Sequence, residues 1–100
     1  MSDRVIRHVR IRGRVQAVGF RAFVEHAALR HGVEGWVRNR RDGSVEAVFA
    51  GSTDQMRAVT DACRRGPPGA RVDALEEEAA GEELLAQRAP GDLFSMLRTE

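Results

Sequence analysis

Residues 33–50, VEGWVRNRRDGSVEAVFA, contain two short runs in which apolar or small residues recur at every second position, and a turn separates the runs. Alternation with a period of two is typical of β-strands that bury one face. The Asp42-Gly43 pair between the runs is a frequent hairpin-turn sequence. We therefore predict a β-hairpin here, and the elements on either side of it decide the fold.

A helix is predicted on each side of the hairpin. Before it, apolar residues recur at helical spacing over residues 20–31, and Gly32 follows as a natural stop. After it, Ser52-Thr53-Asp54-Gln55 resembles a capping box, and an apolar stripe continues until the Gly66-Pro67-Pro68 stop. The hairpin is thus expected to lie between two amphipathic helices.

Strands are predicted outside both helices. Residues 4–12 alternate between apolar and charged positions, residues 70–75 form a plausible strand, and residues 93–97 a short terminal one. Residues 76–91 include five glutamates and leave two alternatives, a frayed helical turn or an acidic loop. A solvated acidic face is favoured for this stretch.

The resulting order β-α-β-β-α-β, with an extra C-terminal strand, is that of the α+β ferredoxin-like sandwich. We expect an antiparallel sheet with two helices on one face, forming a single domain over residues 1–100. In this topology the first two strands run parallel on either side of the third. Their C-terminal ends, near Arg12 and Asn39, should therefore meet at one edge of the sheet, about 10 Å apart.

Composition limits the possible functions. The 100 residues are 42% hydrophobic and 31% charged, which supports one modest core. All sixteen basic residues are arginines, so a lysine nucleophile or a phosphate-loop lysine is excluded. Because Cys63 is the single cysteine, an intrachain disulfide is excluded, and a reducing, cytoplasmic location is favoured. Cys63 lies on the apolar stripe of the second predicted helix, where we expect a buried, inert thiol. Charges recur through the first twenty-one positions, which leaves no stretch for a signal peptide or membrane span.

Charge is distributed unevenly along the chain. Residues 1–41 carry a net charge of +7 and residues 42–100 a net charge of −6. Residues 4–24 contain six arginines and no acid. Two interpretations are open: the arginines pair with acids distant in sequence, or this half of the chain binds an anion.

The segment GRVQAVGFR at residues 13–21 connects the first strand to the first helix. The first N–H groups of a helix have no intrahelical partners and the helix dipole is positive there, so this connection favours an anion. Arg21 falls in that first turn, and a bound phosphoryl group would supply the negative charge that the local sequence lacks. Alternatively, Gly13 and Gly19 serve turn geometry alone and Arg21 pairs with a distant acid.

Two segments together carry a family resemblance. Residues 11–21, IRGRVQAVGFR, and residues 35–39, GWVRN, followed by DGSVE at 42–46, resemble the two signature motifs of the acylphosphatases. The resemblance spans essentially the whole chain. It implies the ferredoxin-like fold, hydrolysis of carboxylic-phosphoric mixed anhydrides, and use of neither a metal nor an organic cofactor.

The resemblance also implies roles for individual residues. Arg21 would bind the phosphate and Asn39 would orient the attacking water. The other phosphate ligands would be the backbone amides of Gln16, Ala17, Val18, Gly19 and Phe20. One departure concerns Ala17, which stands where the family usually has glycine, and its methyl group could narrow the loop or disfavour a positive φ.

These residues suit the chemistry. An acyl phosphate expels a carboxylate, which is a good leaving group without a general acid. Phosphoryl transfer then depends mainly on positioning and charge stabilisation. Asn39 can hold a water in line with the leaving group but cannot act as a strong base, so we expect the water's proton to pass to the phosphate itself.

Other functions are also considered. An RNA-binding module of this topology stacks bases on aromatic residues of its central strands, and the outward positions expected here offer none. A catalytically silent anion-binding domain, alone or within a larger maturation protein, is the other alternative. His26 and His31 are five residues apart on a helix and face different directions, so no metal site is expected. We expect a monomer that binds a small-molecule acyl phosphate, with inorganic phosphate as product and competitor, and neither nucleic acid nor membrane.

Overall fold

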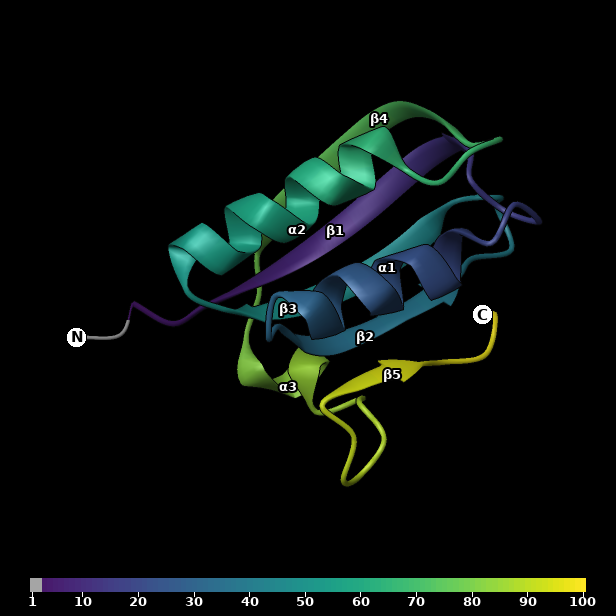
Figure 1. Cartoon of the computed structure of the whole chain (residues 1–100). Coiled ribbons are helices and arrows are strands. Elements are labelled where there is room, and N and C mark those ends of the chain that lie inside the picture. Colours follow the sequence, from purple (N-terminus) through teal and green to yellow (C-terminus); the bar gives the residue numbers. More distant parts are fainter. Residues whose placement is uncertain (1–2) are drawn as a thin grey trace.

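The computed structural model describes residues 3–100. Over these residues the elements follow one another as β1 (Val5–Arg14), α1 (Phe20–Arg30), β2 (Glu34–Asn39), β3 (Val45–Gly51), α2 (Thr53–Arg65), β4 (Arg71–Ala79), α3 (Glu82–Leu85) and β5 (Phe94–Met96). Figure 1 shows α1 and α2 side by side across one face of the sheet. The ferredoxin-like order predicted from the sequence is confirmed.

The sheet has the strand order β4-β1-β3-β2-β5. As predicted, β3 lies between β1 and β2 and is antiparallel to both. The short β5 differs from the expectation of an antiparallel sheet, because it pairs parallel to β2 and makes the sheet mixed. Since β1 and β2 run in the same direction, their C-terminal ends lie at the same edge of the sheet (Figure 1).

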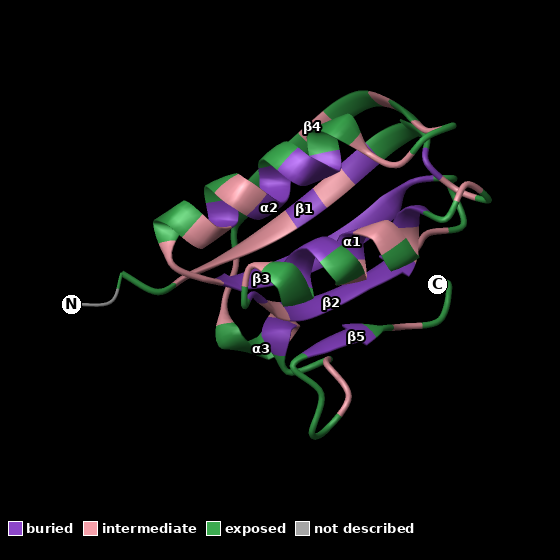
Figure 2. Cartoon of the chain, in the orientation of Figure 1, coloured by how far each residue is buried: buried purple, intermediate pink, exposed green. Residues whose placement is uncertain are grey.

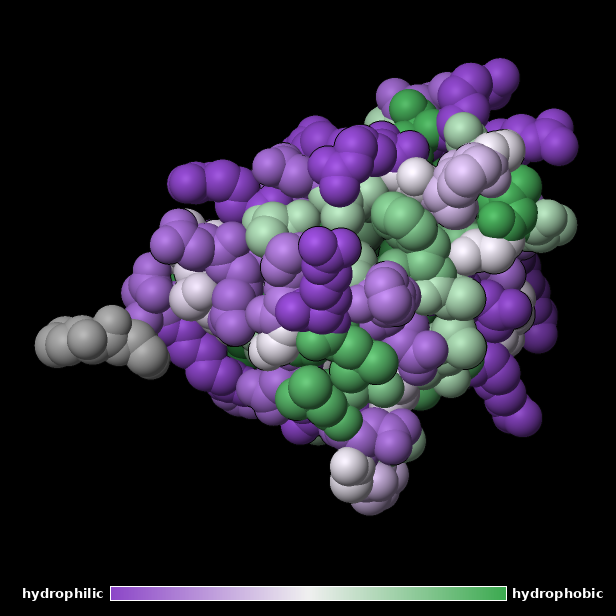
Figure 3. Space-filling model, in the orientation of Figure 1, coloured by the Kyte–Doolittle hydropathy of each residue, from purple (hydrophilic) through white to green (hydrophobic). Residues whose placement is uncertain are grey.

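The main core fills the space between the sheet and the two helices (Figure 2). Val9, Ile11 and Val24 are fully buried there, which matches the apolar stripe of each element. Burial raises the pKa of the Cys63 thiol to about 12, so this thiol stays protonated and unreactive near neutral pH. In the space-filling view, apolar surface (green) along α1 and between the helices is surrounded by hydrophilic side chains (purple) (Figure 3).

The opposite face of the sheet has a second, smaller apolar cluster. Trp36 is fully buried there with Val48, Ala50 and Leu85, and its indole Nε1 donates a hydrogen bond of 2.7 Å to the carbonyl of Leu84. The short helix α3 therefore covers the ring. Because Trp36 is covered, it is no platform on which nucleic-acid bases could stack.

The acidic stretch differs from both alternatives in its first part and matches the helical turn in its second. Residues 76–79 form neither a loop nor a helical turn but the second half of β4, which pairs with β1. In the register, Arg10 lies opposite Glu76 and His8 opposite Glu78, so the basic first strand faces the acidic fourth one. Only residues 82–85 form a helical turn.

Several arginines of the basic half find partners far away in sequence. Arg4 pairs with Glu34 and Glu82, and Arg12 pairs with Glu76. For Arg4 and Arg12, the interpretation that the arginines pair with acids distant in sequence is thus confirmed. Within residues 3–100, no helix is long and apolar enough to cross a membrane.

Candidate active site

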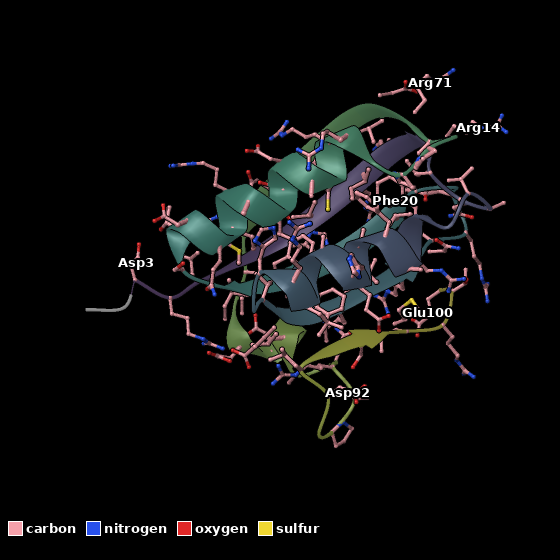
Figure 4. All side chains as sticks on the ribbon, viewed as in Figure 1. Asp3, Arg14, Phe20, Arg71, Asp92 and Glu100 are labelled. Atoms are coloured by element: carbon pink, nitrogen blue, oxygen red, sulfur yellow. The ribbon has the colours of Figure 1, made fainter. Side chains whose placement is uncertain are left out.

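A hollow of about 180 Å³ lies at the sheet edge where β1 and β2 end. It is lined by Val15, Gln16, Ala17, Gly19, Phe20, Arg21, Ala22, Asn39 and Met96. Figure 4 shows Arg14, at the end of β1, Phe20, at the start of α1, and Glu100 at this same end of the molecule. The topology therefore brings together the two segments whose residues the sequence singled out.

The structure gathers most of the predicted site residues around this hollow. Val18 is the exception, because its side chain packs against the main core instead. Met96, which sequence reasoning missed, reaches the hollow because β5 pairs with β2 and places Met96 opposite Val37. No local sequence signal indicates that pairing.

The connection between β1 and α1 presents backbone donors without protein partners. Within residues 3–100, the N–H groups of residues 16–22 donate to no backbone or side-chain acceptor, and the first such bond is from the Phe23 N–H to the Gly19 carbonyl at 3.0 Å. Gly19, the N-cap of α1, has no side chain to cap the helix and adopts φ 77° and ψ 21°. Such a run of unpaired N–H groups at a positive helix end favours an anion.

Ala17 adopts a left-handed conformation in this connection. Its φ is 61°, the one positive φ among the described non-glycine residues. This conformation costs an L-amino acid about 1–2 kcal/mol. The sequence raised the concern that alanine would disfavour a positive φ here, yet the connection adopts one, with Ala17 exposed to solvent.

Arg21 is half-buried at the hollow and differs from the paired arginines of β1. Among residues 3–100, no carboxylate forms an ion pair with its guanidinium. The first turn of α1 also contains no acidic residue. The alternative in which Arg21 pairs with a distant acid is therefore not what the described residues show. The positive charge lies beside the unpaired N–H groups.

Asn39 ends β2 and contributes an unsatisfied acceptor. Its side-chain Oδ1 is buried and accepts no hydrogen bond from any described protein group. A buried polar atom without a partner costs about 1–3 kcal/mol, so such atoms are rare and need a reason. The backbone carbonyl of Asn39, by contrast, accepts a bond of 3.2 Å from the Glu100 N–H. The backbone of the strand end is thus held in place, whereas the side chain of Asn39, which borders the hollow, keeps an acceptor without a protein partner among the described residues.

A charged network lies under this strand end, on the opposite face of the sheet. Glu46 accepts hydrogen bonds from His8 Nε2 at 2.6 Å, Arg38 Nε at 2.8 Å and Arg40 Nη1 at 3.4 Å. Burial by itself would raise the pKa of Glu46, but the bonds from His8 and Arg38 outweigh it, so the pKa lies below its ordinary value. Glu46 therefore remains ionised and accepts hydrogen bonds from Arg38 and Arg40, the two residues that flank Asn39.

The described residues contain no other obvious reactive centre. Within residues 3–100, no three side chains of His, Cys, Asp or Glu converge in a way that could hold a metal ion. The functional groups at the hollow are instead a guanidinium, a row of main-chain N–H donors and a neutral amide. In this small α+β protein the groups at the hollow are therefore of the kind that favours an anion.

Comparison with known proteins identifies the family. The sequence profile of the family described as Acylphosphatase matches residues 7–87. The chain is 54% identical over 97 residues to an acylphosphatase of Bradyrhizobium diazoefficiens, covering 97% of this chain and 98% of that protein. It is 53% identical over 99 residues to an acylphosphatase of Rhodopseudomonas palustris, covering 99% of each.

The fold agrees with this assignment. The crystal structure of the acylphosphatase from Bacillus subtilis matches with a TM-score of 0.80 at 30% identity, covering 93% of this chain and 98% of that one. The chain belongs to the acylphosphatase family. The resemblance seen in the two sequence motifs is thereby confirmed.

Proposed function

We propose that this enzyme holds the phosphoryl group of an acyl phosphate with Arg21 and the amides of residues 16–20, while Asn39 orients the attacking water. The reaction is that of its family, the hydrolysis of an acyl phosphate to a carboxylate and inorganic phosphate. The observation that carries the residue roles is that the buried Asn39 Oδ1 has no described protein partner, while the residue Asn39 borders the same hollow as Arg21.

Phosphate binding follows from the charges and donors present. A phosphoryl group carries its negative charge on oxygens that accept hydrogen bonds, and a guanidinium donates two parallel N–H groups to such oxygens. The N–H groups of residues 16–20 add further donors at the positive end of α1. These donors stabilise the equatorial oxygens as the transition state develops, without having to reorganise at that moment.

The attacking water is positioned by a neutral group. The Asn39 Oδ1 accepts a hydrogen bond from the water, which fixes one lone pair of the water toward phosphorus. As the water oxygen bonds to phosphorus, the bond from phosphorus to the acyl oxygen breaks and the carboxylate leaves with the electron pair. The proton of the water passes to a phosphate oxygen, so no histidine or carboxylate base takes part.

Several wider features belong to the same proposal. We infer that the enzyme works without a metal ion, as a monomer formed by one domain, and in the cytoplasm. No nucleic acid is expected to bind, because Trp36 is covered by α3 and two arginines of β1, Arg10 and Arg12, pair with acids. A filter-binding assay with single-stranded RNA at physiological salt tests the RNA-binding alternative, and retention of RNA would support it.

The decisive experiment is hydrolysis of benzoyl phosphate in the presence of EDTA. We expect turnover by the unaltered enzyme, a loss of about 1,000-fold in kcat/KM for Arg21→Gln, and a loss of about 100-fold in kcat for Asn39→Ala, in line with removal of single transition-state donors and water-positioning groups. Inorganic phosphate should inhibit Asn39→Ala about as well as the unaltered enzyme, and Arg21→Gln much less.

Arg14→Gln is the matched control. Arg14 is an exposed arginine at the end of β1 that does not border the hollow and forms no ion pair among the described residues. Its replacement removes the same charge nearby, so its activity should stay within about threefold of the unaltered enzyme, because an exposed charge is largely screened. Full activity in Arg21→Gln or Asn39→Ala would remove that residue from its role.

A further inference from the structure

The two halves of the site come from segments far apart in sequence, and one side chain joins them. Gln16 belongs to the connection between β1 and α1, and its Nε2 donates to the carbonyl of Arg40 at 2.7 Å and to that of Ser44 at 2.8 Å. Both carbonyls belong to the turn that follows Asn39 directly. We propose that Gln16 is a positioning residue that sets the separation between the phosphate held by the connection and the water held by Asn39.

The turn after Asn39 is a fixed anchor for Gln16. The Arg40 N–H donates to the Ser44 carbonyl at 2.8 Å, and the Gly43 N–H donates to the Arg40 carbonyl at 3.1 Å. The Ser44 N–H and hydroxyl both donate to Asp42 Oδ1, at 2.9 and 2.6 Å. The two carbonyls that receive the Gln16 amide are therefore held by the turn's own hydrogen bonds.

Asn39 itself lies in a tightly held part of the chain. Its neighbours Arg38 and Arg40 both bond to Glu46 on the other side of the sheet, and its carbonyl accepts the Glu100 N–H. Its position is set without help from the connection between β1 and α1. Any variation in the separation of the two halves must therefore come from the other segment.

The side chains of Val15, Val18 and Phe20 anchor that other segment in or against the main core, and the hydrogen bonds of Gln16 fix the exposed part between them. Within residues 3–100, none of the N–H groups of residues 16–19 donates to a protein acceptor, and Ala17 is held at a φ of 61°. A strained backbone conformation persists only where surrounding contacts enforce it. The two hydrogen bonds of Gln16, next to Ala17, are such contacts, and without them the backbone at residues 16 and 17 is free to relax away from Asn39.

Such a shift would change turnover more than phosphate affinity. The amides and Arg21 belong to one segment and move with the phosphate, so phosphate binding survives a small displacement. The water belongs to the other segment, and an in-line attack depends on its alignment with phosphorus. A misplacement of about 1 Å can lower the rate about 100-fold. The inference rests on the proposed roles of Arg21 and Asn39.

The test is Gln16→Met, which keeps the length of the side chain and removes both donors. With benzoyl phosphate we expect kcat to fall about 10- to 100-fold, whereas the inhibition constant of inorganic phosphate changes less than about threefold. Gln55→Met is the matched control, because Gln55 Nε2 also donates to a backbone carbonyl, that of His31 at 3.0 Å, but lies away from the hollow. The Gln55→Met variant should be less stable than the unaltered enzyme but have the same kcat.

A second readout separates positioning from a general structural role. If Gln16 acts through the water held by Asn39, then Gln16→Met in the Asn39→Ala background should cause less than about a twofold further loss of kcat, measured at high enzyme concentration. Gln16→Asn, which keeps the amide but is one methylene shorter, should reproduce the kcat loss of Gln16→Met, and it serves as the test protein if Gln16→Met does not fold.

Three results would overturn the inference. They are unchanged kcat in the Gln16 variants, a phosphate inhibition constant that rises in proportion to the loss of kcat, and kcat losses that multiply in the double variant. The proposed function has a separate failure, which is an active Arg21→Gln or Asn39→Ala enzyme. Inactive Arg21 and Asn39 variants beside a fully active Gln16→Met would therefore reject the positioning role alone.

Discussion

The two segments that border the hollow are built in opposite ways. The connection over residues 15–19 leaves its N–H groups without protein acceptors and contains two residues with positive φ, Ala17 and Gly19. The turn over residues 40–44 is closed by backbone bonds and by the Asp42 carboxylate. The segment proposed to bind the substrate keeps its donors available, whereas the segment next to Asn39 satisfies its own. Binding of a ligand and positioning of a side chain therefore place opposite demands on the backbone.

Gly19→Val and Gly43→Val place the same substitution in each of the two segments, and the largest expected effect is the loss of phosphate affinity in Gly19→Val. Both glycines have positive φ, 77° and 94°, and at both positions an added Cβ would meet nothing within 4 Å. Each substitution therefore acts through backbone strain, costing about 1–3 kcal/mol of unfolding free energy. For Gly19→Val we expect the inhibition constant of phosphate to rise at least about 30-fold, because the relaxed backbone redirects the N–H donors.

For Gly43→Val the phosphate inhibition constant should stay within about threefold while kcat falls, because only the positioning segment is disturbed. Melting temperature and steady-state inhibition by phosphate measure the two quantities. Equal losses of phosphate affinity in the two variants would contradict the division of roles.

Glu46→Gln tests how much the charge of the Glu46 carboxylate contributes to the stability of the network on the other face of the sheet from Asn39. The folded-state pKa of Glu46 lies below its ordinary value of 4.5, so the stabilisation by the ionised carboxylate is fully present above that pH and is lost as pH falls through the lower folded-state pKa. We expect the variant to be about 2 kcal/mol less stable at neutral pH, since bonds from charged donors are lost. The difference should shrink below pH 4.5. Urea unfolding at several pH values measures it, and a pH-independent difference would argue against this account.

Asp42→Ala loosens the turn itself. The substitution removes the acceptor of both Ser44 bonds, at 2.9 and 2.6 Å, and the longer ion pairs with Arg10 and Arg12. We expect kcat to fall about fivefold with little change in phosphate inhibition, because the anchor of Gln16 becomes mobile while the binding segment is untouched. Asp54→Ala, at an exposed acid in α2, is the control. An equal loss of kcat there would show a non-specific effect of charge.

Ala17→Gly is expected to have the smallest effect. Glycine removes the cost of the positive φ but adds freedom to the unfolded chain, and these contributions nearly cancel. We expect a shift in melting temperature of less than about 4 °C, corresponding to less than about 0.5 to 1 kcal/mol. Phosphate inhibition should change less than about twofold. A large gain in phosphate affinity would mean that the Ala17 methyl group narrows the binding segment.

Much of the fold follows from local patterns. The hairpin of residues 33–50, the capping box at Ser52 and the order of the elements could all be predicted, since each depends on neighbours in sequence. Residues 76–79 could not, because three successive glutamates are typical of solvated loops. They form a strand because β1 presents Arg10 and Arg12 to them across the sheet. That stabilisation comes from charges more than sixty residues away.

The candidate site, too, could be predicted only where it depends on local sequence patterns. The two motifs and the predicted topology are enough to place Arg21 and Asn39 at one edge of the sheet. The side chain of Gln16, however, has partners 24 and 28 residues away, and a glutamine in a connection carries no signal of what it bonds. A helical turn within residues 76–91 was one of the two alternatives, but four residues are too few to show a periodicity that would place α3 over Trp36.

The uncapped beginning of α1 has a consequence for the lifetime of the protein. A ligand that binds only the folded chain raises its free energy of unfolding, by about 2.7 kcal/mol at a concentration 100 times its dissociation constant. If phosphate completes the start of this helix, abundant product slows local opening and with it digestion by proteases. Turnover of the polypeptide would then follow the phosphate level around it, with scarcity shortening its survival.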